Sequence, residues 1–291
     1  MVGKVLRLAL VCVLALVVVA AATAASPDVA TMNLQPADVP GAKVVNQRAV
    51  NEKGYLAAHI RSFLFAAPNG SARLVSIESE TKLAPTAVAA KADVAVVNKA
   101  FHTQAGRQAF VATVAKQLKV KPKAVMVGQV RQVAGYDQSA ELPTSVTVKG
   151  TRIYENLVFL SLDRVAVLVV ETGLRPITAA VTGKYAAAIA GHIGTALAPV
   201  VVTPPSVTGT AQQGQTLTAT PGTSTATDAT FGYQWQRCDA TGANCADLQG
   251  ATTSTYAVTP ADVGATLRVV VKATNRFGSA PATSAQTAVV T

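Results

Sequence analysis

The chain of 291 residues has only three cysteines, three histidines and one tryptophan, and charged residues make up 14% of it. A zinc site built on Cys238 and Cys245 would need two more ligands, and the nearest histidine in sequence, His192, lies in a different segment. The chain also has no G-x-S-x-G elbow, P-loop, H-E-x-x-H helix or EF-hand loop. These absences predict a protein that is not an enzyme, with no metal site and no cofactor.

The few groups that could carry chemistry are scattered. The histidines lie far apart, each in an expected strand or helix, and we interpret them as partly exposed, unconnected residues: His59, His102 and His192. Glu78 and Glu80 share one strand face, as acid–base catalysis or cation binding would require. A solvent-facing strand edge explains these two carboxylates as well, and we favour that interpretation.

The N-terminus reads MVGKVLRLALVCVLALVVVAAATAASPD. Lys4 and Arg7 precede an apolar run that ends in small residues at Ala25, which is the pattern of a secretory signal peptide. An uncleaved anchor is the alternative, because the apolar run is just long enough to span a bilayer. The small residues favour cleavage, so we predict a signal peptide over residues 1–25, including Cys12, and a secreted, extracellular protein.

Without that signal, Cys238 and Cys245 are the only cysteines, and six residues separate them. In an oxidising compartment such a pair is expected to form a disulfide. A redox pair would more usually have C-x-x-C spacing. The sequence therefore predicts a disulfide bond that closes a short loop.

The net charge of +10 is distributed unevenly. Residues 26–198 contain 19 Lys plus Arg against 11 Asp plus Glu, which is +8, whereas residues 199–291 contain four of each. Between them, ALAPVVVTPPSV contains two adjacent prolines, which neither a helix interior nor a central strand accepts. We expect a basic domain over 26–198, a Pro-rich linker over 199–205 and a neutral domain over 206–291.

The neutral part shows short strand-like segments separated by turn residues, and this pattern predicts an all-β sandwich. The segments are QTLTAT, FGYQWQRC, STYAVT, TLRVVVKAT and SAQTAVV. Asp262 in TPADVG is expected to cap a turn before a strand. Strand alternation places Trp235 on the core face and Cys238 on the opposite face. We interpret Trp235 as a core residue rather than a carbohydrate contact.

Three stretches of this region are distinctive: VTGTAQQGQTLTAT, YQWQRCD and GANCADLQGATTSTYAVTPADVGATLRVVVKATNRFGSAPATSAQTAVV. They resemble the Ig-like modules of secreted proteins from high-GC bacteria. The resemblance covers nearly all of residues 205–291. It implies an Ig-like β-sandwich that acts as a spacer or adhesion module without catalytic residues. That family often has a Trp where GTST stands here, near Ser224, so one of its packing contacts is missing.

The basic part mixes strand and helix patterns. HIRSFLFAAPNGSARLVSIESET predicts two strands around an Asn69–Gly70 turn. A helix should begin at Pro85 and break at Gly106, and RQAFVATVAKQL predicts a second. Four strands, KAVMVGQVRQV, TSVTVKG, RIYENLVFLSL and RVAVLVVETG, precede a last helix, ITAAVTGKYAAAIAGHIGTAL. This order predicts an α+β domain with a mainly antiparallel sheet and helices on one or both faces.

The segment LQPADVPGAKV contributes to a resemblance of this α+β region to extracytoplasmic sensor and lipoprotein domains, including those of Mog1/PsbP-like fold. No functional residues follow from that resemblance.

One cluster of charge stands out, in KQLKVKPKAV, where a helix should end and a strand begin: Lys116, Lys119, Lys121 and Lys123. Cations at a helix C-terminus are favoured by the helix dipole, which explains them structurally. The functional alternative is a contact for an anionic cell-wall polymer or lipid headgroups. Nucleic acid is a poor candidate, since no aromatic residues interleave the lysines.

Taken together, these patterns favour a secreted, non-catalytic envelope or extracellular binding or sensing protein. Two alternatives stay open: an enzyme whose site within 26–198 escapes motif searches, and a carrier for lipid or a small apolar ligand. A polar cleft with histidine or paired carboxylates would favour the enzyme, and a large apolar cavity would favour the carrier.

Overall fold

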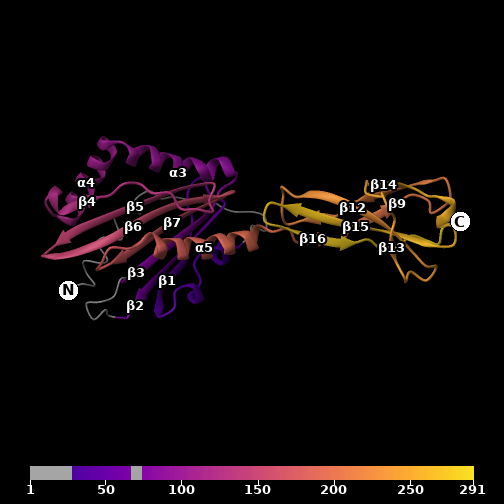
Figure 1. The fold of residues 1–291 in the computed structure, drawn as a ribbon, viewed down its shortest axis with the longest axis horizontal. Helices are drawn as coiled ribbons and strands as arrows, with labels where there is room; N and C mark the ends of the chain where they lie inside the picture. The colour runs from indigo at the N-terminus through magenta and orange to yellow at the C-terminus, as the bar shows by residue number, and fades with distance from the viewer. Residues whose placement is uncertain (1–27, 67–73) are drawn as a thin grey trace. The chain divides into compact units, whose positions relative to one another are not determined.

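The computed structural model describes residues 28–66 and 74–291. The expected signal peptide with Cys12 and the expected Asn69–Gly70 turn lie outside the described residues. The chain divides into two compact units, Met1–Ala196 and Leu197–Thr291, which Figure 1 colours from indigo to salmon and from orange to yellow. Both are built mainly from antiparallel sheets, and the α-helices of the described residues begin in the first unit.

A seven-stranded antiparallel sheet forms the centre of the first unit, in the order β1-β2-β3-β7-β6-β5-β4. Its strands are β1 Ala42–Val50, β2 Ala57–Phe65, β3 Ser76–Leu83, β4 Val125–Val127, β5 Gln138–Val148, β6 Thr151–Leu162 and β7 Val165–Gly173. The expected strands are present, although KAVMVGQVRQV supplies only the short β4. The edge strand β1 was not predicted, because its side chains are exposed at nearly every position and show no alternation.

The helices of this unit are α2 Val29–Met32, α3 Ala87–His102, α4 Gln104–Leu118 and α5 Ala179–Leu197, with short 3-10 turns at Pro36–Asp38 and Pro122–Ala124. The predicted break at Gly106 is wrong, because the chain breaks at Thr103. The Thr103 hydroxyl accepts a hydrogen bond from the Gly106 amide at 3.0 Å and so caps α4. A Cβ at Gly106 would lie 1.9 Å from the Ala100 carbonyl oxygen, so glycine is required by this close approach.

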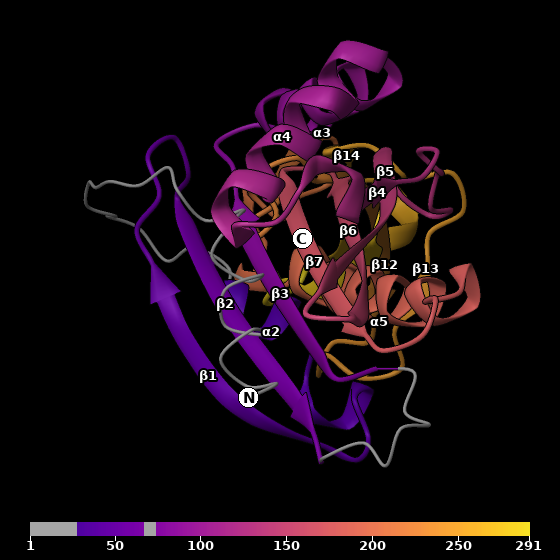
Figure 2. The same cartoon turned by 90° about the vertical axis from the view of Figure 1, so that its left-hand side faces the viewer.

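Helices cover both faces of the sheet (Figure 2). On one face, Val170 of β7 belongs to an apolar cluster that includes Phe101 of α3 and Phe110 of α4, whose ring centroids are 5.2 Å apart. The next residue, Glu171, points to the opposite face and accepts a hydrogen bond from Thr182 of α5 at 2.6 Å. The pair α3 and α4 therefore packs on one face and α5 on the other.

The second unit has a four-stranded sheet, β13-β12-β15-β16, and a three-stranded sheet, β14-β10-β9. The bounds are β9 Ser206–Thr208, β10 Thr216–Thr220, β12 Thr230–Cys238, β13 Ala246–Asp247, β14 Thr255–Ala257, β15 Thr266–Asn275 and β16 Gly278–Thr283. Both sheets contribute to one core around Trp235, which is fully buried and stacks on Tyr256 at 5.6 Å. The interpretation of Trp235 as a core residue is confirmed.

Two segments of this unit differ from expectation. SAQTAVV forms no strand; its backbone instead bonds irregularly to β15, for example from the Thr287 amide to the Leu267 carbonyl. Within the expected linker, residues Val201–Thr203 form β8, which pairs with β11, Thr223–Ser224. The expected cap at Asp262 is confirmed, since Asp262 and Thr259 form a capping box around the turn Pro260–Asp262.

Candidate functional site

The four lysines singled out by the sequence lie together at one corner of the first unit, and all four are exposed. Lys116 lies in the last turn of α4, and Lys119 is its C-cap with a left-handed φ of 54°. Lys121 and Lys123 flank the following Pro122 on the way into β4. The prediction that they gather where a helix ends and a strand begins is confirmed.

The corner rests on an apolar base. Ala115 of α4, Val125 of β4, Val146 of β5 and Ile153 of β6 form one buried cluster, with Leu118 and Val120 packed against it. The Val120 amide donates to the Ala115 carbonyl at 2.9 Å, which closes the helix end. Because these apolar residues fix the backbone, the lysine side chains project from a rigid support.

Two further cations come from the β5–β6 hairpin. Val125 of β4 pairs with Val146 of β5, so the chain just before β4 runs beside the hairpin that carries Lys149 and Arg152. The Arg152 guanidinium donates to the Ser145 hydroxyl at 3.2 Å and contacts the Met126 sulfur. We call these six residues the basic corner: Lys116, Lys119, Lys121, Lys123, Lys149 and Arg152.

Carboxylates are missing from the segments that build this corner, since residues 104–127 and 145–154 contain no Asp or Glu. Within the described part of the chain, the ion pairs involve none of the six cations. The positive charge of the basic corner is thus available to a partner. Met126, 56% exposed, is the one large exposed apolar residue among these described segments.

A polar cluster is buried under α5, which the sequence did not reveal. Glu141 of β5 accepts hydrogen bonds from Asn156 of β6 at 2.8 Å and Arg131, and Glu171 of β7 accepts from Thr182. Glu141 and Glu171 are 2% and 0% exposed. Burial raises the pKa of Glu171 to about 7, since the hydrogen bond from Thr182 compensates only partly and Glu141 adds like charge.

The expectation that Glu78 and Glu80 lie on a solvent-facing strand edge is wrong. Their strand β3 is paired on both sides, with β2 and β7, and both residues are buried. The Ser62 hydroxyl donates to Glu78 at 2.7 Å. Burial raises the pKa of both carboxyl groups. The alternation of the strand was interpreted correctly, but its place in the middle of the sheet depends on pairings remote in sequence.

The three histidines have separate partners. The His59 ring faces the Asn33 amide at 3.3 Å and is buried rather than partly exposed, so its pKa is lowered, first by burial and then by Arg61. His102 bonds the Asn98 carbonyl at the end of α3, and His192 bonds Asp38 at 2.9 Å. In residues 28–66 and 74–291, no group of three His, Cys, Asp or Glu side chains is placed to hold a metal ion.

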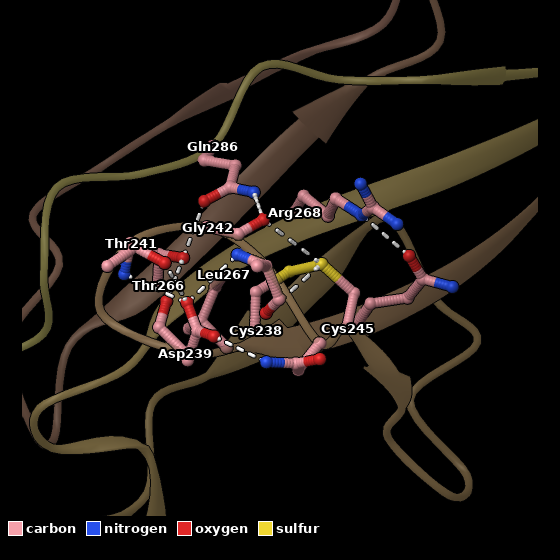
Figure 3. The surroundings of a disulfide bond; sticks show 12 residues. Cys238, Asp239, Thr241, Gly242, Cys245, Thr266, Leu267, Arg268 and Gln286 are labelled. Atoms are coloured by element: carbon pink, nitrogen blue, oxygen red, sulfur yellow. Dashed lines mark hydrogen bonds between the residues drawn. A yellow bond between two sulfur atoms is a disulfide. The ribbon is translucent and has the colours of Figure 1, made fainter.

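In the second unit, Cys238 and Cys245 form a disulfide with an S–S distance of 1.97 Å (Figure 3). Cys238 ends β12 and Cys245 precedes β13, so the bond closes a hairpin loop, as predicted. Cys238 lies outside the Trp235 core but is 2% exposed, so it does not face solvent. Gln286 lies over the loop, donating to the Gly242 carbonyl at 2.5 Å and accepting from Thr266.

Asp239 organises the same loop. Its carboxylate accepts hydrogen bonds from the Thr241 hydroxyl, the Ala243 amide and the Asn244 side chain. These bonds, from Thr241 first, lower the pKa of Asp239 to about 2. The loop is therefore held both by the disulfide and by one exposed carboxylate.

Replacing Cys238 with Ala and Cys245 with Ser should lower the free energy of unfolding of the second unit by roughly 2–3 kcal/mol, since a closed loop of this length restricts the unfolded chain. The unit should stay folded, because neither cysteine belongs to the Trp235 core. Urea unfolding followed by Trp235 fluorescence measures the change. Copurified zinc, or a double variant that does not fold, would contradict the role assigned to the pair.

No family model and no curated protein matches this chain. Among solved structures, it is similar to the extracellular domain of PknH from Mycobacterium tuberculosis, with 12% identity and a TM-score of 0.38; the match covers 60% of this chain and all of that one. No helix among the described residues combines the length and apolar character needed to span a membrane.

Proposed function

We propose that this is a secreted, non-catalytic protein of the bacterial cell envelope whose first unit binds an anionic cell-wall polymer through the basic corner. The observation that carries the proposal is the gathering of six exposed cations from α4, the chain before β4 and the β5–β6 hairpin, on segments without a carboxylate. Such a surface attracts polyanions over about 8–10 Å at physiological ionic strength.

An anionic polymer suits this surface better than a lipid bilayer. Peripheral membrane surfaces usually combine basic residues with several apolar side chains that enter the headgroup region. Of the large exposed apolar residues in the described part of the corner's segments, only Met126 is present. The basic corner thus offers mainly positive charge, which is sufficient to bind a flexible polyanion.

The second unit, on this proposal, is an Ig-like spacer or adhesion module. It has equal numbers of acidic and basic residues, and its two sheets enclose a core around Trp235. Its aromatic Trp235 is fully buried and so offers no stacking platform for a sugar. As a spacer, it would separate the basic first unit from a partner bound to the second unit.

The intact protein should sediment with an insoluble anionic cell-wall polymer at low salt and be released as salt rises, because exposed charges are screened. Changing Lys116, Lys119, Lys121 and Lys123 to Gln should abolish most of the sedimentation. The matched control changes Lys43, Lys53, Lys99 and Lys184, which are also exposed lysines of the first unit, and should bind nearly as well as the unchanged protein.

Equal loss in the two quadruple variants would show that net charge, not the corner, governs binding. Sedimentation with acidic liposomes but not with the polymer would replace the proposed partner by lipid headgroups. Absence of binding to either at low salt would overturn the proposal.

A further inference from the structure

A cavity of about 290 Å³ lies on the α3 side of the sheet, away from the surfaces used above. Its apolar walls come from α3, β6 and β7: Val94, Val97, Phe159, Ala166 and Leu168. Glu80 and Lys82 of β3 line it from the sheet, and Asp93 and Val96 of α3 line it as exposed residues. The cavity thus combines an apolar interior with two carboxylates, one buried and one at the surface, and the half-buried ammonium group of Lys82.

The buried carboxylate of Glu80 has little compensation from the protein. Lys82 Nζ lies 2.8 Å from Glu52 but 3.8 Å from Glu80, which is beyond hydrogen-bond distance. The Lys82 ammonium also stands over the Tyr55 ring at 5.2 Å, so it is held on the side of Glu52. Glu80 is buried all the same, with only 5% of its surface exposed. The ion pair of Glu80 with Lys82 is thus long and shared with Glu52, and a buried charge so weakly paired is costly, so that a bound cation would reduce the cost.

The charges around Glu80 add to the imbalance. Glu52 and Glu78 both act on it as like charges, and Lys82 is the one opposite charge among the groups that shift its pKa. Lys91 of α3 forms its ion pair with Asp137 instead of Glu80, with 3.6 Å between the Lys91 ammonium and the Asp137 carboxylate. The lining itself, with Glu80 and Asp93 against Lys82, has a formal charge of −1, and Glu52, which is ion-paired with Lys82, adds a further negative charge beside it.

We propose that this cavity binds a small organic cation with an apolar body, whose ammonium group lies between Glu80 and Asp93 and whose body packs on Phe159 and Leu168. The volume, at the small end of ligand sites, limits the ligand to a fragment-sized amine. The inference does not depend on the basic corner, which selects charge of the opposite sign.

The test uses n-hexylamine as the probe, with n-hexanoate as its anionic counterpart, on the full-length protein by calorimetry. Hexylamine should bind with a Kd of roughly 1 mM, as expected for a fragment of this size, and hexanoate should not bind. Glu80→Gln should weaken hexylamine binding at least tenfold, and Asp93→Asn less, because Asp93 is exposed. Asp228→Asn, the same charge change in the second unit, should leave binding unchanged.

Binding of hexylamine should also strengthen between pH 5 and pH 8 in the unchanged protein, and less so in Glu80→Gln, where Asp93, whose pKa is also raised by burial and by Glu52, is the remaining carboxylate of the lining. Burial, more than its like-charged neighbours, raises the pKa of Glu80, so the ionised form that attracts an ammonium grows with pH. Glu80→Gln keeps the shape of the side chain, and helical ellipticity would verify its fold. Equal binding of hexanoate and hexylamine, no effect of Glu80→Gln, or no binding of hexylamine would each overturn the proposal.

Discussion

Replacing Asp262 with Ala is expected to lower the free energy of unfolding of the second unit by about 3 kcal/mol, because it leaves the Arg237 charge without its partner. In a unit of this size the melting temperature should fall by roughly 12–20 °C. Trp235, the only tryptophan of the chain, is buried in this unit, so its fluorescence reports the transition directly.

The expected loss is large because one carboxylate holds four donors. Asp262 is 0% exposed; its Oδ1 accepts from Arg237 at 2.7 Å, and its Oδ2 accepts from Tyr256, the Thr259 amide and the Thr259 hydroxyl. Tyr256 in turn stacks on Trp235. Removal of Asp262 therefore disturbs the core as well as the turn. Arg237 is 35% exposed, which places the loss at the lower end of the range for buried pairs.

Two variants separate the contributions. Asp262→Asn keeps one acceptor oxygen and should cost less than Asp262→Ala, whereas the exposed Asp228→Asn should change the stability little. Burial alone would raise the pKa of Asp262, but bonds from Thr259, Arg237 and Tyr256 lower it overall. The stability that Asp262 contributes should thus be present at neutral pH and be lost as pH falls below about 4. If Asp262→Ala melted within about 2 °C of the unchanged protein, the hydrogen bonds of Asp262 would not contribute to the stability of the second unit.

Local patterns in the sequence predicted the features that depend on near neighbours. The core position of Trp235 follows from its place in the middle of an alternating strand, and the cap at Asp262 from the short motif TPADVG. The lysines of KQLKVKPKAV are adjacent in sequence, so their grouping at a helix end was visible. The turn cap and the lysine cluster depend on contacts within a few residues, and for Trp235 the alternation of its own strand was sufficient to predict burial, although its packing partners are remote in sequence.

Features that depend on strand order were not visible. Lys149 and Arg152 join the basic corner only because β4 pairs with β5, and Glu80 is buried only because β7 pairs with β3. Each of these pairings joins residues at least 17 positions apart in the chain, as Val127 and Thr144 are, and periodicity carries no information on them. A basic hairpin tip such as VKGTR, lacking carboxylates, was the one signal available for the missing cations.

Glu171→Gln is expected to leave the first unit unchanged in stability near pH 5 but to stabilise it by about 2–3 kcal/mol at pH 8. Glu171 is 0% exposed to solvent, and this burial in the apolar interior raises its pKa to about 7. Its Oε1 atom has no hydrogen-bond partner among the described residues. The ionised form of this side chain is therefore disfavoured in the folded protein.

The sign follows from proton binding. Folded protein keeps the Glu171 proton up to about pH 7, whereas the unfolded chain releases it near its ordinary pKa of 4.5. Between these values the folded state binds more protons, so its stability falls as pH rises, by at most about 1.4 kcal/mol per pH unit for one group. Glu155, whose pKa is also raised by burial to about 7, acts in the same direction. Glutamine imitates the protonated carboxyl group and can still accept from Thr182.

Urea unfolding followed by helical ellipticity isolates the first unit, since the α-helices of the described residues begin there. Glu155→Gln is the companion variant and should remove a further part of the slope between pH 5 and pH 8, while Glu78 and Glu80, whose pKa values burial also raises, contribute to the rest. Thr182→Val, which removes the hydroxyl that holds the Glu171 carboxylate at 2.6 Å, should destabilise the unit more at pH 8 than at pH 5, because that bond opposes the burial of the charge. A Glu171→Gln protein with the same loss of stability toward pH 8 as the unchanged protein would show that Glu171 is already ionised below pH 5 and that Arg131, beyond Glu141, compensates its charge.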